Sequence, residues 1–526
     1  MFYKTILLFS IFFSFFIVGF SQTSMPVVEW ARTYGGAQLD IGSTIVVTSD
    51  NKYVICGTTS SQDKDTLRRP TGWDGLIMKT DANGNVIWKK IYGGNGEDAL
   101  DKIIQTVDGG FMVCGAEVSN DGIFSTNKGD YDAWIMKLDS LGNFQWQKTY
   151  GGSGIDIARG IIQDDQSNYV FIVNSDSKDG DFNDTSKVGT VWLVKINNKG
   201  NIIWKRKYGG SDINDNGLNL IKYDNKSYLM VGETRSNDGD FKNSKGNFIM
   251  KVDSAGNTMW LKSPGSPYDS VSIFNGYNSV ILTKDGNIMA LGYAYAYYQV
   301  INHAQLDYLL TKMDKDGNVI WSKMYGGTLF DVGKTLLELP SGEFIAVGIT
   351  YSNDGDIDPH CRYGMEEDIW TIKLDSIGQI IWKICLGGSK DDYTYEGSAS
   401  LAKDGAILIT GYTTSNDGIF SKNYGSYDIP IIKLRDLLKT DIDNTNYLQN
   451  FKCYPNPVSS NLTIENNSES VLKIRLINSL GQVILNNSYS IGTYQLDCQQ
   501  LPNGFYQLNV SSTNNAFISK KIIIQK

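Results

Sequence analysis

The chain has 526 residues, of which 12% are aromatic, 54 are glycine and 10 are proline, a composition typical of many short strands joined by tight turns. Its net charge of −9 argues against a nucleic-acid or anionic-membrane partner, because both would also be negatively charged. Only two histidines, His303 and His360, are present, which leaves little material for a histidine base or a multi-histidine zinc site.

Residues 1–21 have the features of a signal peptide. A lysine precedes an apolar run over residues 6–20, and Gly19 and Ser21 occupy the −3 and −1 positions of a cut before Gln22. The run is short for a membrane span, and no second apolar run of spanning length follows. We expect an exported protein that is soluble once cut, and the small-residue cleavage site disfavours the alternative of a retained anchor.

Residues 22–436 contain a repeat of about 58 residues. Successive tryptophans of the repeat are separated by 58, 58, 58, 56, 61 and 61 residues, and a fixed period of this length is typical of stacked or radial repeats. A lysine also recurs seven times with the same period. The tryptophans are Trp30, Trp88, Trp146, Trp204, Trp260, Trp321 and Trp382, and the lysines are Lys79, Lys137, Lys195, Lys251, Lys312, Lys373 and Lys433.

Each repeat divides into four strand-like pieces. In the second copy these are residues 99–106, 111–115, 134–138 and 144–149, and Asp-Gly-Gly and Gly-Asn turns join the first pair and the last pair. Gly and Asn supply the positive-φ positions that tight hairpins need, and branched and aromatic residues fill the strands. Four antiparallel strands repeated radially predict the blades of a β-propeller.

Seven copies of the lysine predict seven blades. No Gly-Asn-x-x-Trp strand follows the last lysine, and residues 27–32, which include Trp30, provide the missing fourth strand. We therefore predict an all-β fold, a seven-bladed β-propeller closed by an N-terminal strand, because closure removes an open edge. An open solenoid would leave both the orphan strand and the incomplete last repeat unexplained.

The direction of the strands predicts where the loops emerge. The fourth-to-first and second-to-third connections should share one face, which we call the long-loop face, and the tight hairpins should occupy the other. Variable loops on a rigid scaffold are where binding residues tend to lie.

The last 75 residues differ from the repeat, and a polar linker over residues 437–451 precedes them. Residues 452–526 contain short strands, a Leu-Gly-Gln turn with Gly481, a Leu-Pro-Asn-Gly-Phe-Tyr segment with Gly504, and a basic apolar end. They begin with the motif Tyr454, Pro455, Asn456 and Pro457. This segment resembles the C-terminal sorting domain of the type IX secretion system. The resemblance implies a small β-sandwich, contact with the type IX machinery, and a protein secreted from, or tethered to the outer membrane of, a Gram-negative bacterium.

The repeats resemble the W-x-K-x-Y-G-G and D-G-G repeats that are common in proteins secreted by this route. That resemblance implies a fold and a location but no activity.

Six cysteines in an exported chain do not form an obvious disulfide framework. Cys56 and Cys114 occupy the same repeat position and are expected to be small buried hydrophobic residues. In the C-terminal segment Cys453 and Cys498 could pair, whereas Cys361 and Cys385 show no partner pattern.

One set of aspartates falls six residues after the Tyr, or Leu386, of the Y-G-G motif. The set either forms a broken ring of cation ligands around the central channel or caps each turn through backbone N–H groups, and the recurrence of the turn favours capping. Its members are Asp40, Asp98, Asp156, Asp331 and Asp392.

A second set belongs to the S-N-D-G loops. Asp354, Asp356 and Asp358 have the alternating spacing of a calcium loop, although Pro359 stands where an EF-hand has glycine. Ca²⁺ is the one cofactor that the sequence suggests. The full set is Asp121, Asp179, Asp238, Asp354 and Asp417.

Aromatic residues in the long loops are the candidate ligand-binding residues, because rigid aromatic faces beside carboxylates suit sugar or protein recognition. The candidates are Trp73, Tyr131, Tyr293, Tyr295, Tyr297 and Tyr298, and Tyr363 and Tyr427 decorate the same loops. The fifth repeat departs most from the pattern, because the Y-G-G before it is lost and its loop is rich in tyrosine.

No nucleophile–base pair, phosphate loop or metal quartet is found, so no catalytic residue is predicted. We expect a monomeric, non-enzymatic propeller that binds a glycan or a surface protein through its long-loop face. The alternative is a polysaccharide hydrolase or lyase that uses carboxylates of that face. Repetition of the acidic positions favours binding, because a catalytic site breaks the symmetry of a repeat.

Overall fold

The computed structural model describes residues 25–61, 72–124, 127–184, 189–212, 215–244, 246–265, 267, 275–295, 306–359, 361, 366–436, 451–467, 471–478, 483–512 and 517–526. These residues form 37 strands and two one-turn 3-10 helices, η1 (Gly180–Phe182) and η2 (Gly239–Phe241). The predicted all-β class is confirmed. Within these ranges no helix has the length and apolar character that a membrane span requires.

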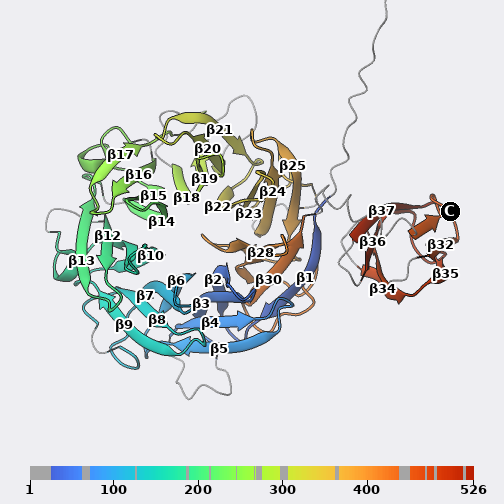
Figure 1. Ribbon diagram of the computed structural model, residues 1–526, viewed down its shortest axis with the longest axis horizontal. Coiled ribbons are helices and arrows are strands. Elements are labelled where there is room, and N and C mark those ends of the chain that lie inside the picture. Colours follow the sequence, from blue (N-terminus) through green and yellow to red (C-terminus); the bar gives the residue numbers. More distant parts are fainter. Residues whose placement is uncertain are drawn as a thin grey trace, which may run out of the picture.

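Six repeats each fold into a four-stranded antiparallel sheet of four consecutive strands, which we call blades 1 to 6. Figure 1 shows the blades arranged as a ring, with the first strand of each blade innermost and the fourth outermost. Blade 1 consists of β2 (Asp40–Val47), β3 (Tyr53–Thr59), β4 (Asp74–Thr80) and β5 (Val86–Tyr92). Blade 2 consists of β6 (Ala99–Gln105), β7 (Phe111–Glu117), β8 (Asp132–Leu138) and β9 (Phe144–Tyr150), and blade 3 of β10 (Asp156–Gln163), β11 (Tyr169–Ser175), β12 (Thr190–Ile196) and β13 (Ile202–Tyr208).

The other three blades follow the same order around the ring (Figure 1). Blade 4 consists of β14 (Asn216–Asp224), β15 (Ser227–Glu233), β16 (Asn247–Asp253) and β17 (Thr258–Lys262). Blade 5 consists of β18 (Asn275–Leu282), β19 (Ile288–Tyr295), β20 (Leu306–Met313) and β21 (Val319–Tyr325), and blade 6 of β22 (Asp331–Glu338), β23 (Phe344–Thr350), β24 (Asp368–Leu374) and β25 (Ile380–Leu386).

A further four-stranded sheet, which we call blade 7, joins the start of the repeat region to its end. The N-terminal strand is antiparallel to a strand of the last repeat, with Val27 opposite Arg435 and Tyr34 opposite Ile429. The order of strands in this sheet is β1 (Val27–Tyr34), β30 (Ile429–Arg435), β28 (Ile407–Thr410) and β27 (Ala399–Leu401), and a two-stranded sheet of β26 (Asp392–Tyr393) and β29 (Tyr412–Thr413) accompanies it.

The W-x-K-x-Y sequence recurs because it fastens each blade to the next. A Cβ at Gly142, in the Gly-Asn turn of blade 2, would lie 2.7 Å from the ring of Trp88 in blade 1. Lys90 donates to the side-chain oxygen of Asn143 at 2.6 Å, and the Tyr92 hydroxyl donates to the carbonyl of Gly142. The repeat tryptophans therefore lie between blades, against a turn that only glycine permits.

Six of the seven recurrent third-strand lysines are buried and pair with the acidic residue of the Asp-Gly-Gly hairpin, or its equivalent, in the same blade, whereas Nζ of the half-buried Lys251 lies 3.4 Å from the ring centroid of Tyr223. Lys137 lies 3.0 Å from Asp108, and Lys312 lies 2.7 Å from Asp285. Since a buried charge without a partner is costly, lysine and hairpin carboxylate recur together.

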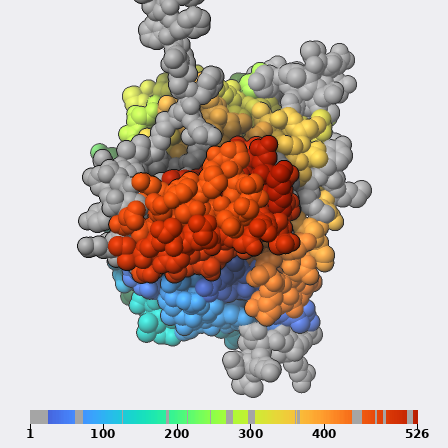
Figure 2. All heavy atoms as spheres, turned by 90° about the vertical axis from the view of Figure 1, so that its right-hand side faces the viewer, coloured from blue at the N-terminus to red at the C-terminus, as the bar shows by residue number. Residues whose placement is uncertain are grey.

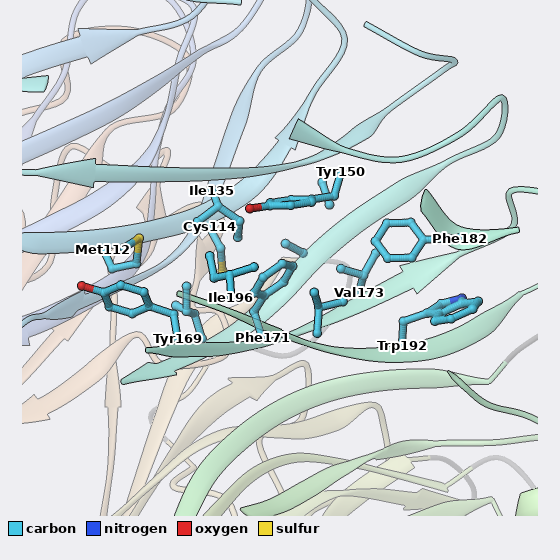
Figure 3. Close-up of a cluster of buried hydrophobic side chains, with 14 residues drawn as sticks. Met112, Cys114, Ile135, Tyr150, Tyr169, Phe171, Val173, Phe182, Trp192 and Ile196 are labelled. Carbon is cyan, nitrogen blue, oxygen red and sulfur yellow. The ribbon is translucent and has the colours of Figure 1, made fainter. Parts of the chain in front are cut away.

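The apolar core lies between neighbouring blades. Figure 3 shows the cluster that blades 2 and 3 share, in which Tyr150 and Ile135 of blade 2 face Phe171 and Val173 of blade 3. Cys114 is buried in this cluster as a free thiol, as predicted for a small hydrophobic residue.

The C-terminal strands form two sheets on a shared core, in which Leu462 and Ile464 of one sheet join Ile474, Leu476 and Leu508 of the other. This part forms a separate lobe beside the ring (Figure 1), and Figure 2 shows the lobe facing the viewer. Arg475 donates to the carbonyl of Glu29 at 3.4 Å. One sheet contains β31 (Phe451–Tyr454), β32 (Asn461–Asn466) and β35 (Gly492–Asp497), and the other β34 (Val483–Tyr489), β33 (Leu472–Asn478), β36 (Gly504–Ser512) and β37 (Phe517–Ile524).

The cysteines correct the sequence interpretation. Cys361 and Cys385, which show no pattern in the sequence, form a disulfide with Cα atoms 5.5 Å apart. The loop before β24 packs against the apolar cluster of blade 6, which places Cys361 beside β25. In contrast Cys453 and Cys498 are free thiols, because the strands that lead to them, β31 and β35, pair with opposite edges of β32.

Candidate functional site

The recurrent aspartates after Y-G-G cap their own turns. Oδ2 of Asp98 accepts hydrogen bonds from the Gly94 N–H at 2.6 Å and from the Ser119 hydroxyl at 2.8 Å. Asp215 makes the same contacts in blade 4, and sequence reasoning missed it because its spacing from the tyrosine is seven residues instead of six. All six carboxylates, Asp40, Asp98, Asp156, Asp215, Asp331 and Asp392, are buried.

The S-N-D-G aspartates also bind backbone groups. Asp354 accepts from the Thr328 N–H at 2.8 Å, and Asp356 accepts from the Gly326 N–H at 3.4 Å. The loop thereby closes over the preceding Y-G-G turn. Among the described residues, which include Asp354, Asp356 and Asp358, no group of three or more acidic, histidine or cysteine side chains is arranged to hold a metal ion. Calcium binding by this loop stays a prediction.

A further set of carboxylates lies at the start of the third strands and meets the turn caps. In blade 5 a Cβ at Gly326 would collide with Asp307 and lie 2.8 Å from Oδ2 of Asp331 in blade 6. Burial, followed by the negative charges of Asp331 and Asp356, raises the pKa of Asp307 to about 8. Burial likewise raises the pKa of Asp331 to about 7. Two carboxyl groups thus share a buried site at this junction, a repulsive arrangement when both are ionised.

The predicted aromatic residues lie on three different blades. In blade 5 the half-buried Tyr293 donates its hydroxyl to Glu233, and the N–H of Tyr295 donates to Asn275 at 3.1 Å. Tyr131 of blade 2 donates to Glu97 at 2.6 Å, while Trp73 of blade 1 is 42% exposed. Tyr297 and Tyr298 lie outside the described residues. The described candidates therefore do not form one site.

A tyrosine cluster between blades 6 and 7 is the unpredicted feature of the long-loop face. The rings of Tyr393 and Tyr412 are stacked, with centroids 5.3 Å apart and an interplanar angle of 7°. The rings of Tyr395 and Tyr427 contact this stack edge-on, at 4.8 Å from Tyr393 and 5.0 Å from Tyr412 respectively. We use the name tyrosine cluster for these four residues and Tyr351.

Glu367, at the end of the long loop of blade 6, connects the cluster across the two blades. Its carboxylate accepts hydrogen bonds from the hydroxyls of Tyr351 and Tyr412, the latter at 3.1 Å. Burial and the Glu367 carboxylate together raise the pKa of both phenols well above the ordinary value. The tyrosines therefore stay protonated and donate to Glu367 at any physiological pH.

The cluster breaks the symmetry of the repeat. Tyr393 and Tyr412 are a cross-strand pair of two aromatic residues. The matching pairs of blades 1 to 6 range from Ala99 with Ala116 in blade 2 to Gly276 with Tyr293 in blade 5, and none of them has two aromatic residues. Such a departure from the repeat is what a specific binding site requires.

The first strand of each of blades 1 to 6 contains a β-bulge at the same place, three residues after the turn-capping position. A bulge re-aims the side chain of its extra residue, and bulges are frequent beside binding sites. The bulge residues are chemically diverse although their surroundings repeat: Ser43, Asp101, Arg159, Leu218, Asn278 and Lys334. In blade 7 residues 394–398 interrupt the first strand and include Glu396.

Four of these residues form two charged pairs at or beside the first strands, which are innermost in the ring (Figure 1). Arg159 lies 3.5 Å from Asp101, and Lys334 lies 2.8 Å from Glu396. Their side chains remain in contact with solvent, with exposed fractions of 38% for Arg159, 27% for Asp101 and 23% for Glu396. Burial acts to raise the pKa of Glu396, but Lys334 outweighs it and holds that pKa below its ordinary value. Burial raises the pKa of Asp101, against the opposing effect of Arg159.

The charged pairs and the tyrosine cluster are continuous. Nζ of Lys334 lies 5.6 Å from the ring centroid of Tyr393, and Tyr395 and Glu396 belong to the same inserted segment of blade 7. Together they form an aromatic and charged surface that begins at the long-loop face and extends to the innermost strands.

The YPNP motif of the C-terminal lobe anchors its own last strand. The side chain of Asn456 donates to the carbonyl of Lys521 at 2.7 Å and accepts from the Ile523 N–H at 2.8 Å, between the cis prolines Pro455 and Pro457. Residues 452–525 match the family described as the secretion system C-terminal sorting domain. This lobe is a type IX sorting domain. A sorting domain implies interaction with the type IX machinery and secretion or display at the cell surface.

Within the sorting domain Tyr454 ends β31 and Gly504 begins β36, whereas Gly481 lies outside the described residues. The sorting domain explains how the protein is exported. It does not explain the tyrosine cluster, which belongs to the ring.

The comparison with curated proteins gives no match. Among solved structures, the chain is similar to PorZ, described as an essential bacterial surface component of the type-IX secretion system of Porphyromonas gingivalis. The identity is 8% and the TM-score 0.40, over 94% of this chain and 60% of PorZ. The chain therefore spans 60% of the length of PorZ.

Two further structures have similar scores. A fungal alcohol oxidase of the AA5 family in complex with copper has 11% identity and a TM-score of 0.41, over 95% of this chain and 100% of the oxidase. The WD40 domain of Pan2 from Neurospora crassa has 10% identity and a TM-score of 0.40, over 76% of this chain and 90% of that domain. At these identities and scores the likenesses do not extend to an activity, a ligand or a partner.

Proposed function

We propose that the protein is a secreted or surface-attached, non-enzymatic β-propeller that binds a glycan or a protein ligand through its long-loop face. In this proposal residues 22–436 form seven blades closed by β1. Residues 1–21 are a signal peptide that is removed, residues 437–451 are a linker, and residues 452–526 direct export. The seven four-stranded sheets of the ring support the seven-bladed propeller, and the sorting domain supports export through residues 452–526.

The tyrosine cluster is the observation that carries the binding function. It is a place where the long-loop face departs from the repeat, and it joins two blades through Glu367. Aromatic rings with hydroxyl edges bind ligands that have both apolar and polar faces, and tyrosine is enriched among the residues that dominate binding energy. We therefore move the predicted site from the blade 5 tyrosines to blades 6 and 7.

The absence of enzymatic activity is proposed because the acidic residues of this face have structural roles. Glycoside hydrolysis needs two carboxyl groups that flank a bond of the substrate. Here the turn-capping carboxylates such as Asp392 accept from backbone N–H groups and hydroxyls, and Glu367 accepts from two phenols.

The test applies the secreted full-length protein to a glycan array and to a reducing-sugar release assay. We expect specific binding to a small group of glycans without release of reducing ends. Tyr412→Ala should abolish binding, whereas the matched change Tyr223→Ala, at the hairpin end of β14, should preserve it. Release of reducing ends would instead assign the protein to the polysaccharide hydrolases or lyases, and equal loss of binding in both variants would exclude the tyrosine cluster as the site.

A further inference from the structure

Three cations and two carboxylates lie around the bulges of the innermost strands. Lys102, Arg159 and Lys334 are the cations, and Asp101 and Glu396 are the carboxylates that influence them. Lys334 is matched by Glu396 at 2.8 Å. The excess positive charge therefore belongs to Arg159 and Lys102, in blades 3 and 2.

Most of the hydrogen-bonding capacity of Arg159 is unused. Its single ion pair, from Nη1 to Asp101, is 3.5 Å long, at the limit of a hydrogen bond. Its Nε is buried and has no hydrogen-bond partner within the described part of the chain. A guanidinium group presents five N–H donors in one plane, and a buried donor without an acceptor is costly. Arg159 can therefore donate hydrogen bonds to an additional acceptor.

Lys102 reaches across blade 1 toward blade 7. A Cβ at Gly397 would collide with Nζ of Lys102 and would lie 3.3 Å from the hydroxyl oxygen of Thr44. Gly397 has a φ of 82°, so both its conformation and its lack of a side chain favour glycine. Over the residues that the structure describes, Lys102 has no carboxylate partner within ion-pair distance. Its ammonium group is therefore a second cation available to a ligand.

We propose that Arg159 and Lys102 bind the carboxylate of an acidic sugar at the innermost strands of the ring. This rests on the proposed function as a ligand-binding protein and specifies the chemistry of the ligand. The planar guanidinium matches a planar carboxylate through two parallel hydrogen bonds, and the ammonium adds a point charge.

The tyrosine cluster favours a sugar over an acidic peptide as the source of the carboxylate. A pyranose ring has C–H faces and hydroxyl edges, which complement the rings and hydroxyls of the cluster. Lys334 links the cluster to the charged strands, at 5.6 Å from the Tyr393 centroid. A sugar chain lying on the tyrosines therefore directs its acidic terminal residue toward Arg159.

The test measures binding of three probes to the full-length protein by calorimetry at low salt: trigalacturonate, its methyl ester and triglutamate. We expect trigalacturonate to bind at least about tenfold more tightly than the neutral ester, the loss typical of one charge-assisted hydrogen bond. Arg159→Gln should weaken trigalacturonate binding about tenfold or more, whereas Arg206→Gln, an exposed arginine on the outer strand β13, should have no effect. Lys102→Met provides a second variant that breaks no ion pair, and a weaker affinity is expected there as well.

Equal binding of the acid and its ester, or full affinity in both Arg159→Gln and Lys102→Met, would overturn the inference. If triglutamate binds in an Arg159-dependent manner and trigalacturonate does not, the acidic-sugar assignment is wrong. If none of these probes binds while another glycan binds the array and requires Tyr412, the inference fails and the proposed function stands.

Discussion

The paired carboxyl groups between blades predict that the protein loses stability as the pH rises from acid to alkaline. Asp307 and Asp331 meet at Gly326, and burial raises their pKa values to about 8 and about 7. The unfolded chain ionises these groups near pH 4, whereas the folded chain retains the protons up to neutral pH. The folded state therefore binds more protons between about pH 4 and about pH 8, and the free energy of unfolding falls across that interval.

The size of the effect follows from the pKa of Asp307. The pKa rises from 3.8 to about 8 on folding, and one unit corresponds to 1.36 kcal/mol, so ionisation of this group costs at most about 6 kcal/mol. Asp307→Asn removes the ionisation and preserves the shape. The chain already contains the neutral version of this junction, because Asn247 takes the matching position in blade 4 and its Oδ1 accepts from the Gly265 N–H at 2.9 Å.

Urea denaturation of the full-length protein at pH 5, 7 and 8.5 measures this effect. We expect Asp307→Asn to be about as stable as the parent at pH 5 and more stable by about 2 kcal/mol or more at pH 8.5. Asp314→Asn is the matched control, since Asp314 caps an exposed turn of the same blade and its pKa is lowered by hydrogen bonds from Asn318. The control should gain nothing at pH 8.5. The reasoning is refuted if the difference in stability between Asp307→Asn and the parent is the same at pH 8.5 as at pH 5.

Three other predictions concern closure, export and metal. Deletion of residues 26–31 should lower the melting temperature by about 10 °C or more and cause concentration-dependent association, because β30 loses its partner; a monomer that melts like the parent would contradict closure by β1. A chain ending at Asp436 should fold, since Asp436 still accepts from Lys373 at 2.6 Å and Trp382 at 2.9 Å, but the native host should retain it, and its appearance in the medium would contradict the sorting role. Addition of EDTA should leave the melting temperature unchanged, because the oxygens of Asp354 and Asp356 bind backbone N–H groups; a fall of several degrees would restore a calcium site there.

The repeated parts of the fold could be predicted from the sequence because each has a local physical cause. Gly142 recurs because Trp88 of the preceding blade covers it, and Lys137 recurs because a hairpin carboxylate pairs with it. A residue that has the same structural role in every blade recurs in the sequence at the interval of the repeat. The pairing of β1 with β30 followed from counting these periods.

The candidate site could not be predicted in the same way, because its residues do not repeat. Arg159 and Lys334 occupy the same position in their blades, but Arg159 pairs with the preceding blade and Lys334 with the following one. Only the register of the first strands shows that this position is a bulge. Tyr393 and Tyr412 become adjacent through a cross-strand pair that the insertion at residues 394–398 obscures. The disulfide between Cys361 and Cys385 depends on how a loop returns to its own blade. A variable position within a constant frame is the signal that would have indicated Arg159.

The fastening of Trp and Tyr to the turn of the following blade gives the ring a direction. Trp88 and Tyr92 of blade 1 contact the Gly142 turn of blade 2, and the series ends with Trp382, whose indole N–H donates to Asp436 at the end of the repeat region. During synthesis the contacts of each blade are therefore incomplete until the next blade has been made. The delay is longest for β1, because its partner β30 is made some 400 residues later. Loop closure over such a separation is slow, and the nascent chain has an unpaired first strand until nearly all of it exists. The pairing of β1 with β30 is thus the last contact between blade strands that can form.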